Sequence, residues 1–303
     1  MNGPTRDGGS HRRWHGAFAS GQCHGGGAMP CHRLHCKGFM PRLCKGKHMH
    51  VKVLGSSSGY GQAARTTCFL VDDNCLLDCG SGIVDLDTQA LLQIDTVLLT
   101  HSHLDHCSGL PLLADAHISH GGRGVDIYTQ QETITTLKQQ MFNSQQWPDY
   151  TKASPGNLPW LRLHAVEVGD TVSLPDGLAT ALPAEHNVPA VGWLLEGPWR
   201  ALAFTGDSGP CLAFWHWISH VPSLTDVICE LSYLNENSAQ AMLDGHMSPA
   251  LLIPLLEILP PNAHVWITHT DHRQRTQLLE QVRKELPALL HLHPLEQGIS
   301  IEL

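Results

Sequence analysis

Short apolar runs separated by polar turns recur along the chain from about residue 49 onward, and most have the length of buried strands. In the first half these runs cover residues 51–54, 66–71, 74–77, 95–99 and 125–128. In the second half they cover residues 161–168, 171–174, 178–183, 191–195, 201–204, 225–231, 264–268 and 299–303. Helical patterns follow at residues 131–141, 211–220, 248–259 and 271–285. This order predicts an α/β fold in which two β-rich halves pack face to face with helices outside.

Residues 1–48 have a different composition, with ten glycines, six histidines, four cysteines and hardly any aliphatic run. Such a segment cannot bury a core, and it lacks the apolar stretch of a signal peptide. Its Cys-His-Arg-Leu-His-Cys run at residues 31–36 has a spacing that fits no ordinary zinc finger. We therefore interpret residues 1–48 as a disordered or non-native N-terminal extension and residues 49–303 as a single catalytic domain.

The densest group of metal-ligand side chains is the run His-Ser-His-Leu-Asp-His at residues 101–106, directly after the predicted strand 95–99. A helix start follows, so the run lies on a strand-to-helix turn. His101 and His103 alternate along extended chain and would point the same way, whereas Asp105 and His106 can face a second position nearby. Imidazole and carboxylate suit zinc-like ions, and the lack of a cysteine in the run favours a hydrolytic over a structural site.

The 101–106 run resembles the signature of the metallo-β-lactamase superfamily, whose members are mostly hydrolases with one or two metal ions at the edge of a four-layer αββα sandwich. Three further ligand-type residues appear in the expected order, each after or at the close of a short apolar run: His186, Asp207 and His269. The resemblance implies two divalent metal ions with these ligands: His101, His103 and His186 for one, Asp105, His106 and His269 for the other, and Asp207 as the bridge.

The last third of the chain resembles the class II cyclic-nucleotide phosphodiesterases. The similar segments are Ile-Cys-Glu-Leu-Ser-Tyr at 228–233, Gly-His-Met-Ser-Pro at 245–249 and Ile-Thr-His at 267–269. Leu104 also suits that class, whereas Cys107 and Pro111 stand where it usually has aliphatic residues. The resemblance spans about residues 51–303. It implies a phosphodiesterase that opens 3′,5′-cyclic nucleotides, such as cyclic AMP, to 5′-monophosphates.

Residues can also be proposed that orient the attacking hydroxide and that act on the leaving group. Two dications about 3.5–4 Å apart can hold a bridging hydroxide at neutral pH, and Asp105 would orient it as well as bind metal. His246 lies outside the ligand set and can protonate the leaving 3′-oxygen or hold a phosphate oxygen, with Glu230 orienting its ring. Its alternative role is that of a helix-capping histidine. His272 competes with His269 as the last ligand, and we favour His269 because it directly ends a predicted strand.

An aspartate at the position of Asp78 would, by the same resemblance, fix the loop that presents the histidines, with an ordinary turn aspartate as the alternative. The long loop 143–160 carries Trp147, Tyr150 and Trp160, which either stack on a purine base or anchor the loop on the core.

The net charge of the chain distinguishes between a small substrate and a long nucleic acid. The chain has a formal net charge of −9, but residues 1–48 contain eight basic residues against one acid, so the remainder carries about −16. A surface this acidic repels polyanions, which favours a small phosphodiester over long nucleic acid. No apolar run of 18 residues occurs, so the sequence predicts no membrane span.

The six cysteines after residue 48 form no C-x-x-C pair, which predicts reduced, buried thiols and a cytoplasmic protein. Cys107 is an exception, because it directly follows the predicted ligand His106 and could contact the metal or the substrate.

Other reactions remain open at this point. The same centre could hydrolyse a carbonyl substrate such as a lactone, thioester or β-lactam, and a mononuclear iron oxygenase or a non-catalytic metal scaffold is a further alternative. The sequence also leaves open zinc or manganese as the metal, and a monomer or a homodimer as the assembly.

Overall fold

The computed structural model describes residues 48–303 apart from residues 60, 62–63 and 154–157. The interpretation of residues 1–48 as an extension therefore lies outside the described residues, except at His48. Among the helices of this described part, we find none whose length and apolar character would let it cross a membrane.

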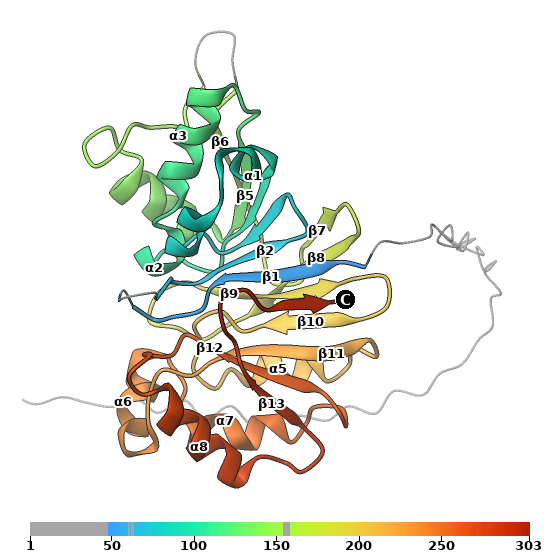
Figure 1. Ribbon diagram of the computed structural model, residues 1–303. Helices are drawn as coiled ribbons and strands as arrows, with labels where there is room; N and C mark the ends of the chain where they lie inside the picture. Colours follow the sequence, from blue (N-terminus) through green and yellow to red (C-terminus); the bar gives the residue numbers. More distant parts are fainter. Residues whose placement is uncertain (1–47, 60, 62–63, 154–157) are drawn as a thin grey trace, which may run out of the picture. The chain divides into compact units, whose positions relative to one another are not determined.

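The described chain forms two sheets of seven strands each (Figure 1). In spatial order, the first sheet contains β14 (Ser300–Glu302), β1 (His50–Gly55), β2 (Cys68–Val71), β3 (Cys75–Leu77), β4 (Thr96–Leu98), β5 (Val125–Thr129) and β6 (Leu161–Ala165). The second contains β13 (His291–Pro294), β12 (His264–Thr268), β11 (Leu224–Glu230), β10 (Ala201–Phe204), β9 (Val191–Glu196), β8 (Gly177–Pro183) and β7 (Thr171–Leu174). The last strand, β14, returns to the first sheet and pairs antiparallel with β1.

Side chains on the two faces of each strand enter different cores. In β9, Val191, Trp193 and Leu195 belong to the cluster between the sheets, whereas Leu194 belongs to the cluster under the second layer of helices. A third cluster lies between the first sheet and its own helices. Three buried clusters separate four layers, so the predicted αββα sandwich is confirmed.

Helices cover the outer face of each sheet (Figure 1). Those that follow strands of the first sheet are α1 (Thr88–Gln93), α2 (Leu104–Cys107), α3 (Leu110–His120) and α4 (Gln131–Thr136), with the one-turn segments η1 (Ser81–Asp85) and η2 (Leu137–Met141). Those of the second half are α5 (Leu212–Ile218), η3 (Asn235–Asn237), α6 (Ser238–Asp244), α7 (Pro249–Leu256) and α8 (Arg275–Glu285). Segment η2 has π geometry, so the predicted helix 131–141 changes its hydrogen bonding after one and a half turns.

The apolar pattern did not reveal β13, α6 and α1, nor the one-turn segments η1 and η3. Strand β13 reads His-Leu-His-Pro and becomes a strand because it pairs in parallel with β12. In α6 only Ala241 is buried, so the helix has no apolar face that a pattern could detect. Helix α1 is equally exposed and depends on Asp87, whose side chain accepts a hydrogen bond from the Ala90 amide at its first turn.

The aromatic loop after η2 is anchored on the protein. Trp147 and Tyr150 pack against the cluster under the first sheet's helices, and the Tyr150 hydroxyl donates to Asp115. For these two residues the core-anchoring interpretation is therefore correct, and their rings are not available to stack on a base.

Candidate metal centre

The predicted ligand residues lie just beyond the carboxyl ends of strands. In the second sheet, β8, β10 and β12 run in the same direction and are followed by His186, Asp207 and His269. In the first sheet, β4 leads into the 101–106 run, and the neighbouring parallel strand β3 leads into Asp78. Because parallel strands present their carboxyl ends at one edge, residues far apart in sequence meet there.

Asp78 holds the turn that carries the histidines. Its Oδ1 accepts hydrogen bonds from the backbone N–H of Thr100, at 2.7 Å, and from the Thr100 hydroxyl, at 3.0 Å. Its Oδ2 lies 2.7 Å from Nδ1 of His106. Asp78 itself has a left-handed backbone with φ of 58°, a conformation that aspartate tolerates better than most residues. The structure thus gives Asp78 the supporting role that the resemblance implied.

The seven predicted ligand residues form two adjoining clusters. In the first, ligand atoms of His101, His103, His186 and Asp207 all lie within 4.8 Å of one another. In the second, the same holds for Asp105, His106, Asp207 and His269. Asp207 belongs to both clusters, which is the position that a bridging ligand requires.

Four of the five imidazoles in these clusters have their outer nitrogen fixed by a neighbour. The pairs are His101 Nδ1 with Thr100 Oγ1 at 2.9 Å, His106 Nδ1 with Asp78 at 2.7 Å, His186 Nδ1 with the Gly245 carbonyl at 2.9 Å, and His269 Nδ1 with Ser232 Oγ at 3.0 Å. In each case this leaves Nε2 directed to the cluster, which is the usual arrangement of a metal-bound histidine.

Three buried atoms inside the clusters lack a hydrogen-bond partner among the described residues: His101 Nε2, His106 Nε2 and Asp207 Oδ1. The last two approach to 3.2 Å without hydrogen-bond geometry. A buried polar atom left unsatisfied costs about 1–3 kcal/mol, so three together indicate a missing partner. Divalent cations would satisfy all three, and the imidazole and carboxylate donors present fit such ions.

The protonation of the imidazoles agrees with this assignment in the first cluster. Burial lowers the pKa of His186 to about 4 and lowers that of His101 well below its ordinary value. Both rings are therefore neutral at pH 7, as metal ligands must be. In the second cluster burial opposes a charge on His106, but the carboxylates of Asp207 and Asp78 outweigh it and raise the pKa of that ring well above its ordinary value.

The two carboxylates of the second cluster differ in exposure. The side chain of Asp207 is 3% exposed, whereas that of Asp105 is 23% exposed and lies 3.0 Å from His269 Nε2. Asp105 is thus the carboxylate that a water molecule or a substrate can reach.

His246 belongs to neither of these two clusters, but with Glu230 and His269 it forms a third group whose ligand atoms lie within 4.8 Å of one another. Its ring centroid is 4.9 Å from that of His186, and its ring stacks on His269 at 5.6 Å. Its Nδ1 is 2.8 Å from Oε1 of Glu230, which is fully buried. Burial disfavours a charge on the ring, but the Glu230 carboxylate overrides this and raises the pKa of His246 to about 9. The Glu230 carboxylate thus favours the protonated ring. Neither α6 nor α7 has a side-chain cap hydrogen bond, so His246 does not act as a helix cap.

The structure separates the remaining candidates from the centre. The His272 side chain is 54% exposed and lies outside both clusters, so the preference for His269 agrees with the geometry. Cys107 is fully buried in the cluster under the first sheet's helices, and its Sγ points to the Ser102 carbonyl. All six described cysteines are buried and free.

Three supporting residues escaped the sequence interpretation: Thr100, Ser232 and Gly245. None has a side chain that identifies a metal site. Their only signal was position, since Thr100 directly precedes the 101–106 run and the other two lie within segments that resemble the phosphodiesterases.

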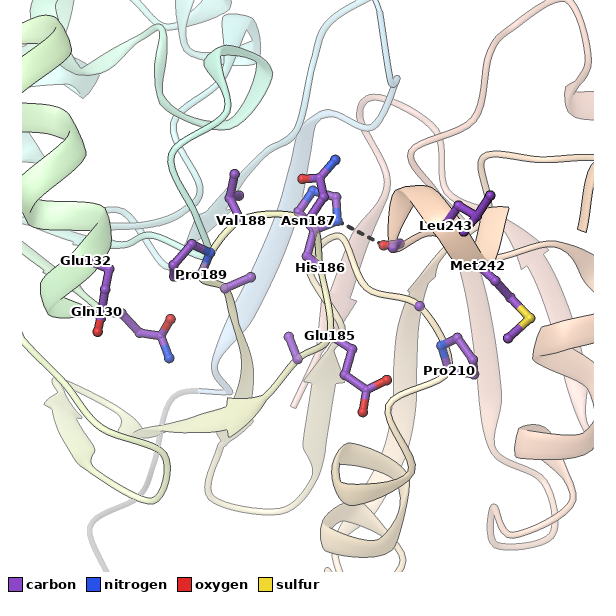
Figure 2. Close-up of a pocket in the computed structure, with 14 residues that line it drawn as sticks. Gln130, Glu132, Glu185, His186, Asn187, Val188, Pro189, Pro210, Met242 and Leu243 are labelled. Carbon is purple, nitrogen blue, oxygen red and sulfur yellow. Dashed lines mark hydrogen bonds between the residues drawn. The ribbon is translucent and has the colours of Figure 1, made fainter. Parts of the chain in front are cut away.

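A cavity of about 730 Å³ opens beside the first cluster, and His186 forms part of its wall (Figure 2). Its other walls come from the start of α4, the loop 184–190, residues 209–210 and the end of α6. Of the seven predicted ligands, His186 lines this cavity, whose volume is large enough for a small molecule.

Comparison with known proteins identifies the family of the chain. A family model described as "Beta-lactamase superfamily domain" matches residues 73–291. A protein of Yersinia pestis named "Probable 3′,5′-cyclic-nucleotide phosphodiesterase" is 29% identical over 183 residues, which are 55% of this chain and 51% of that one. The ribonuclease Z of Synechococcus sp. (strain CC9311) is 30% identical over 172 residues, which are 52% of each chain. The chain thus spans about half the length of these curated relatives.

Among solved structures, unliganded yeast PDE1 superposes with a TM-score of 0.72 at 16% identity, over 84% of this chain and 99% of that one. At this identity the likeness shows the fold alone. Together with the family match over residues 73–291, it shows that the chain belongs to the β-lactamase superfamily and has the metallo-β-lactamase fold.

Proposed function

We propose that this protein is a metal-dependent phosphodiesterase that hydrolyses 3′,5′-cyclic nucleotides, such as cyclic AMP, to 5′-monophosphates. The observation that carries the proposal is the double cluster around Asp207 with His246 beside it, outside the seven ligand residues and held at Nδ1 by the buried Glu230 carboxylate. The similarity to the Yersinia pestis protein supports the same bond and substrate class.

The residues that would hold two divalent ions, zinc or manganese, are the seven of the two clusters, with Asp207 shared. When bound, such ions supply a water-derived nucleophile at neutral pH and offset the negative charge that builds on the phosphate. Asp207 is buried and belongs to both clusters. Asp105 is more exposed, and neighbouring His269 outweighs burial to lower the pKa of Asp105, so its carboxylate stays ionised and can accept a hydrogen bond from an incoming water and orient it.

His246 would act on the leaving group. Its Nδ1 is held by Glu230, so Nε2 is the atom that can donate a proton to the ribose 3′-oxygen as the P–O bond breaks. Glu230 also accepts hydrogen bonds from the Met247 amide, at 3.0 Å, and from the Ser232 hydroxyl, at 2.9 Å. These contacts fix the carboxylate, and through it the direction of the His246 ring.

A ribonuclease is the second candidate, because ribonuclease Z relatives match a similar share of the chain. The same centre can cleave a phosphodiester in RNA. Against it, the chain after residue 48 carries about −16 formal charges, and the residues that line the cavity beside His186 include two glutamates but no lysine or arginine. Proteins that hold long RNA normally supply many basic contacts to its phosphates.

The test is a substrate panel on the purified full chain, with metal content measured by elemental analysis. The panel contains cyclic AMP, cyclic GMP, bis-p-nitrophenyl phosphate, a precursor tRNA, a lactone and a chromogenic β-lactam. We expect about two metal ions per chain and turnover of the cyclic nucleotides. Turnover of the tRNA with inert cyclic nucleotides would replace the proposal by the ribonuclease. Turnover of only the lactone or β-lactam, or one iron per chain with oxygen uptake, would overturn it altogether.

We also propose a cytoplasmic location. All six described cysteines are free and buried rather than joined in disulfides, as expected of a protein from a reducing compartment.

A further inference from the structure

The cavity beside His186 has two walls of different chemistry (Figure 2). One wall carries Gln130 and Glu132, at the start of α4, and the floor carries Glu185, directly before the ligand His186. Its lining residues include no lysine or arginine. The volume of about 730 Å³ lies within the range of about 300–1,000 Å³ that small-molecule sites occupy.

The opposite wall is apolar and belongs to α6. Met242 is 59% exposed and Leu243 is 77% exposed, and both line the cavity. Neither residue belongs to any of the three buried clusters, so packing of the core does not explain them. Large apolar side chains held in solvent at the mouth of a site commonly contact a ligand.

Helix α6 is fixed to the metal centre by its last residues. Gly245 caps the helix in a left-handed conformation with φ of 69°, and its carbonyl lies 2.9 Å from Nδ1 of His186. A Cβ atom at residue 245 would lie 2.8 Å from Cα of His186, so only glycine permits this approach. Met242 and Leu243 therefore stand at a fixed distance from a predicted metal ligand.

Building on the proposed phosphodiesterase function, we propose that this cavity holds the organic part of the substrate and that Glu132 and Glu185 reject any further phosphate on it. His186 belongs both to the first cluster and to the cavity wall, so a substrate with its phosphate at the metal centre would extend past His186 into the cavity that Glu132, Glu185 and the apolar wall line. A neutral or cationic group with an apolar face, such as a nucleoside, fits these walls. A second phosphate would face two like charges, which weakens its binding. The substrate class is thus a small phosphodiester with a single phosphate.

A pair of substrates that differ by one phosphate tests this proposal. Thymidine 5′-(p-nitrophenyl phosphate) and its 3′-phosphorylated form share the same scissile bond and the same leaving group. We expect the full-length enzyme to prefer the first by about tenfold or more in kcat/KM, because a dianion near two carboxylates at an effective dielectric constant of about 20 meets repulsion of this order. We expect the preference to shrink as ionic strength rises.

Charge-neutral variants locate the effect. The double variant Glu132→Gln/Glu185→Gln should reduce the preference to about twofold, mainly by improving kcat/KM for the phosphorylated substrate. Glu167→Gln/Glu257→Gln removes the same two charges from exposed positions that do not line the cavity, and it should keep the full preference. An equal change in both double variants would overturn the proposal in favour of overall charge.

The apolar wall has its own test. Met242→Ala/Leu243→Ala should raise KM for the unphosphorylated nucleoside ester by about fivefold, since it removes apolar contact area. Leu289→Ala truncates a leucine that is 62% exposed and does not line the cavity, and it should leave KM unchanged. An unchanged KM in the double variant would remove α6 from the binding site.

Bis-p-nitrophenyl phosphate tests the phosphodiesterase function separately from the role of the cavity, because it is a phosphodiester that lacks a nucleoside. If the protein with metal bound cleaves neither this ester nor the nucleoside esters nor cyclic AMP, the phosphodiesterase function fails and the substrate class fails with it. If it cleaves these esters but treats the two thymidine substrates alike, the function stands and the role of Glu132 and Glu185 is wrong.

Discussion

The two halves of the metal centre are built in different ways. The first sheet contributes four ligand residues from one short turn, residues 101–106, which Asp78 fixes from the neighbouring strand. The second sheet contributes His186, Asp207 and His269 from three separate strand ends. The first half is therefore encoded locally, whereas the second exists only after β8, β10 and β12 have paired through their neighbours. A compact motif in the sequence can therefore identify the first half of such a site, but only the folded sheet brings the remaining ligand residues to it.

The halves also differ in what surrounds them. Beside the turn and its support, the first half adds Gln130 and Glu132 to the cavity wall, whereas the second half adds His246, Glu230 and the cavity wall of α6. Metal binding thus draws on both halves, while the proton donor and the cavity's apolar wall come from the second. The predictions below test this division, beginning with the largest expected effect.

Asp207→Asn should be the most damaging change, because Asp207 is the residue that both clusters share. We expect metal content to fall from two ions per chain to one or none, and kcat/KM to fall about 1,000-fold or more. Elemental analysis and phosphodiesterase assays measure the two effects. Asp105→Asn is the matched control, since Asp105 belongs to one cluster and should remove only one ion. Two retained ions with normal turnover in Asp207→Asn would contradict the shared role.

His246→Ala should leave both metal ions in place and reduce kcat by about 100- to 1,000-fold, the usual contribution of a general acid. In the unaltered protein, activity should decline on the alkaline side as the ring, with its pKa raised to about 9 by Glu230, loses its proton. The variant should lose this alkaline decline. Loss of a metal ion on this change would instead make His246 a ligand, and an unchanged pH profile would remove it from proton transfer.

Asp78→Asn tests the support of the first half. Asparagine tolerates the left-handed backbone with φ of 58°, but it removes the charge that faces Nδ1 of His106. We expect metal affinity to fall about 10- to 100-fold, as is typical when the partner of a metal-bound histidine is changed. Titration with a competing chelator measures the affinity. An unchanged affinity would mean that Asp78 acts on the turn alone.

Ser232→Ala makes the corresponding change in the second half, where the hydroxyl lies 3.0 Å from Nδ1 of His269. Because a neutral hydroxyl is replaced rather than a carboxylate, we expect a smaller loss of metal affinity, of about tenfold or less. The same chelator titration applies. A loss of metal affinity larger than that of Asp78→Asn would contradict the expectation that the supporting residue of the first half contributes more than that of the second.

Cys107→Ala should have the smallest effect on catalysis. The thiol is fully buried in the core under the first sheet's helices, although it directly follows the ligand His106. We expect activity and metal content within about twofold of the unaltered protein, and a loss of about 1 kcal/mol in the free energy of unfolding from the smaller buried side chain. Denaturant unfolding followed by circular dichroism measures the second effect. Any loss of metal would show that the thiol contacts the centre.

The sequence predicted the fold class and most strands because their apolar runs are short, regular and bounded by turn residues. It missed β13, whose His-Leu-His-Pro sequence becomes a strand only by pairing with β12. It missed α6 for a related reason, since a helix with one buried residue has no apolar period. The seven ligand residues and His246 were all selected from the sequence, and the structure brings the seven into two adjoining clusters. Their occupation by metal stays a prediction.

The sequence by itself determined the local chemistry: a strand-to-helix turn with four ligand-type side chains, and three further ligand residues at the ends of apolar runs. Only the tertiary structure decided which groups hold the outer nitrogens of the histidine ligands. These groups are Thr100 Oγ1, Ser232 Oγ and the Gly245 carbonyl, and their residue types alone do not indicate this role. The cavity has the same origin, since its walls come from α4, α6 and the His186 loop, which are distant in the chain. The chemistry of a side chain is set by its residue type, whereas the meeting of distant residues at one site depends on strand pairing in both sheets.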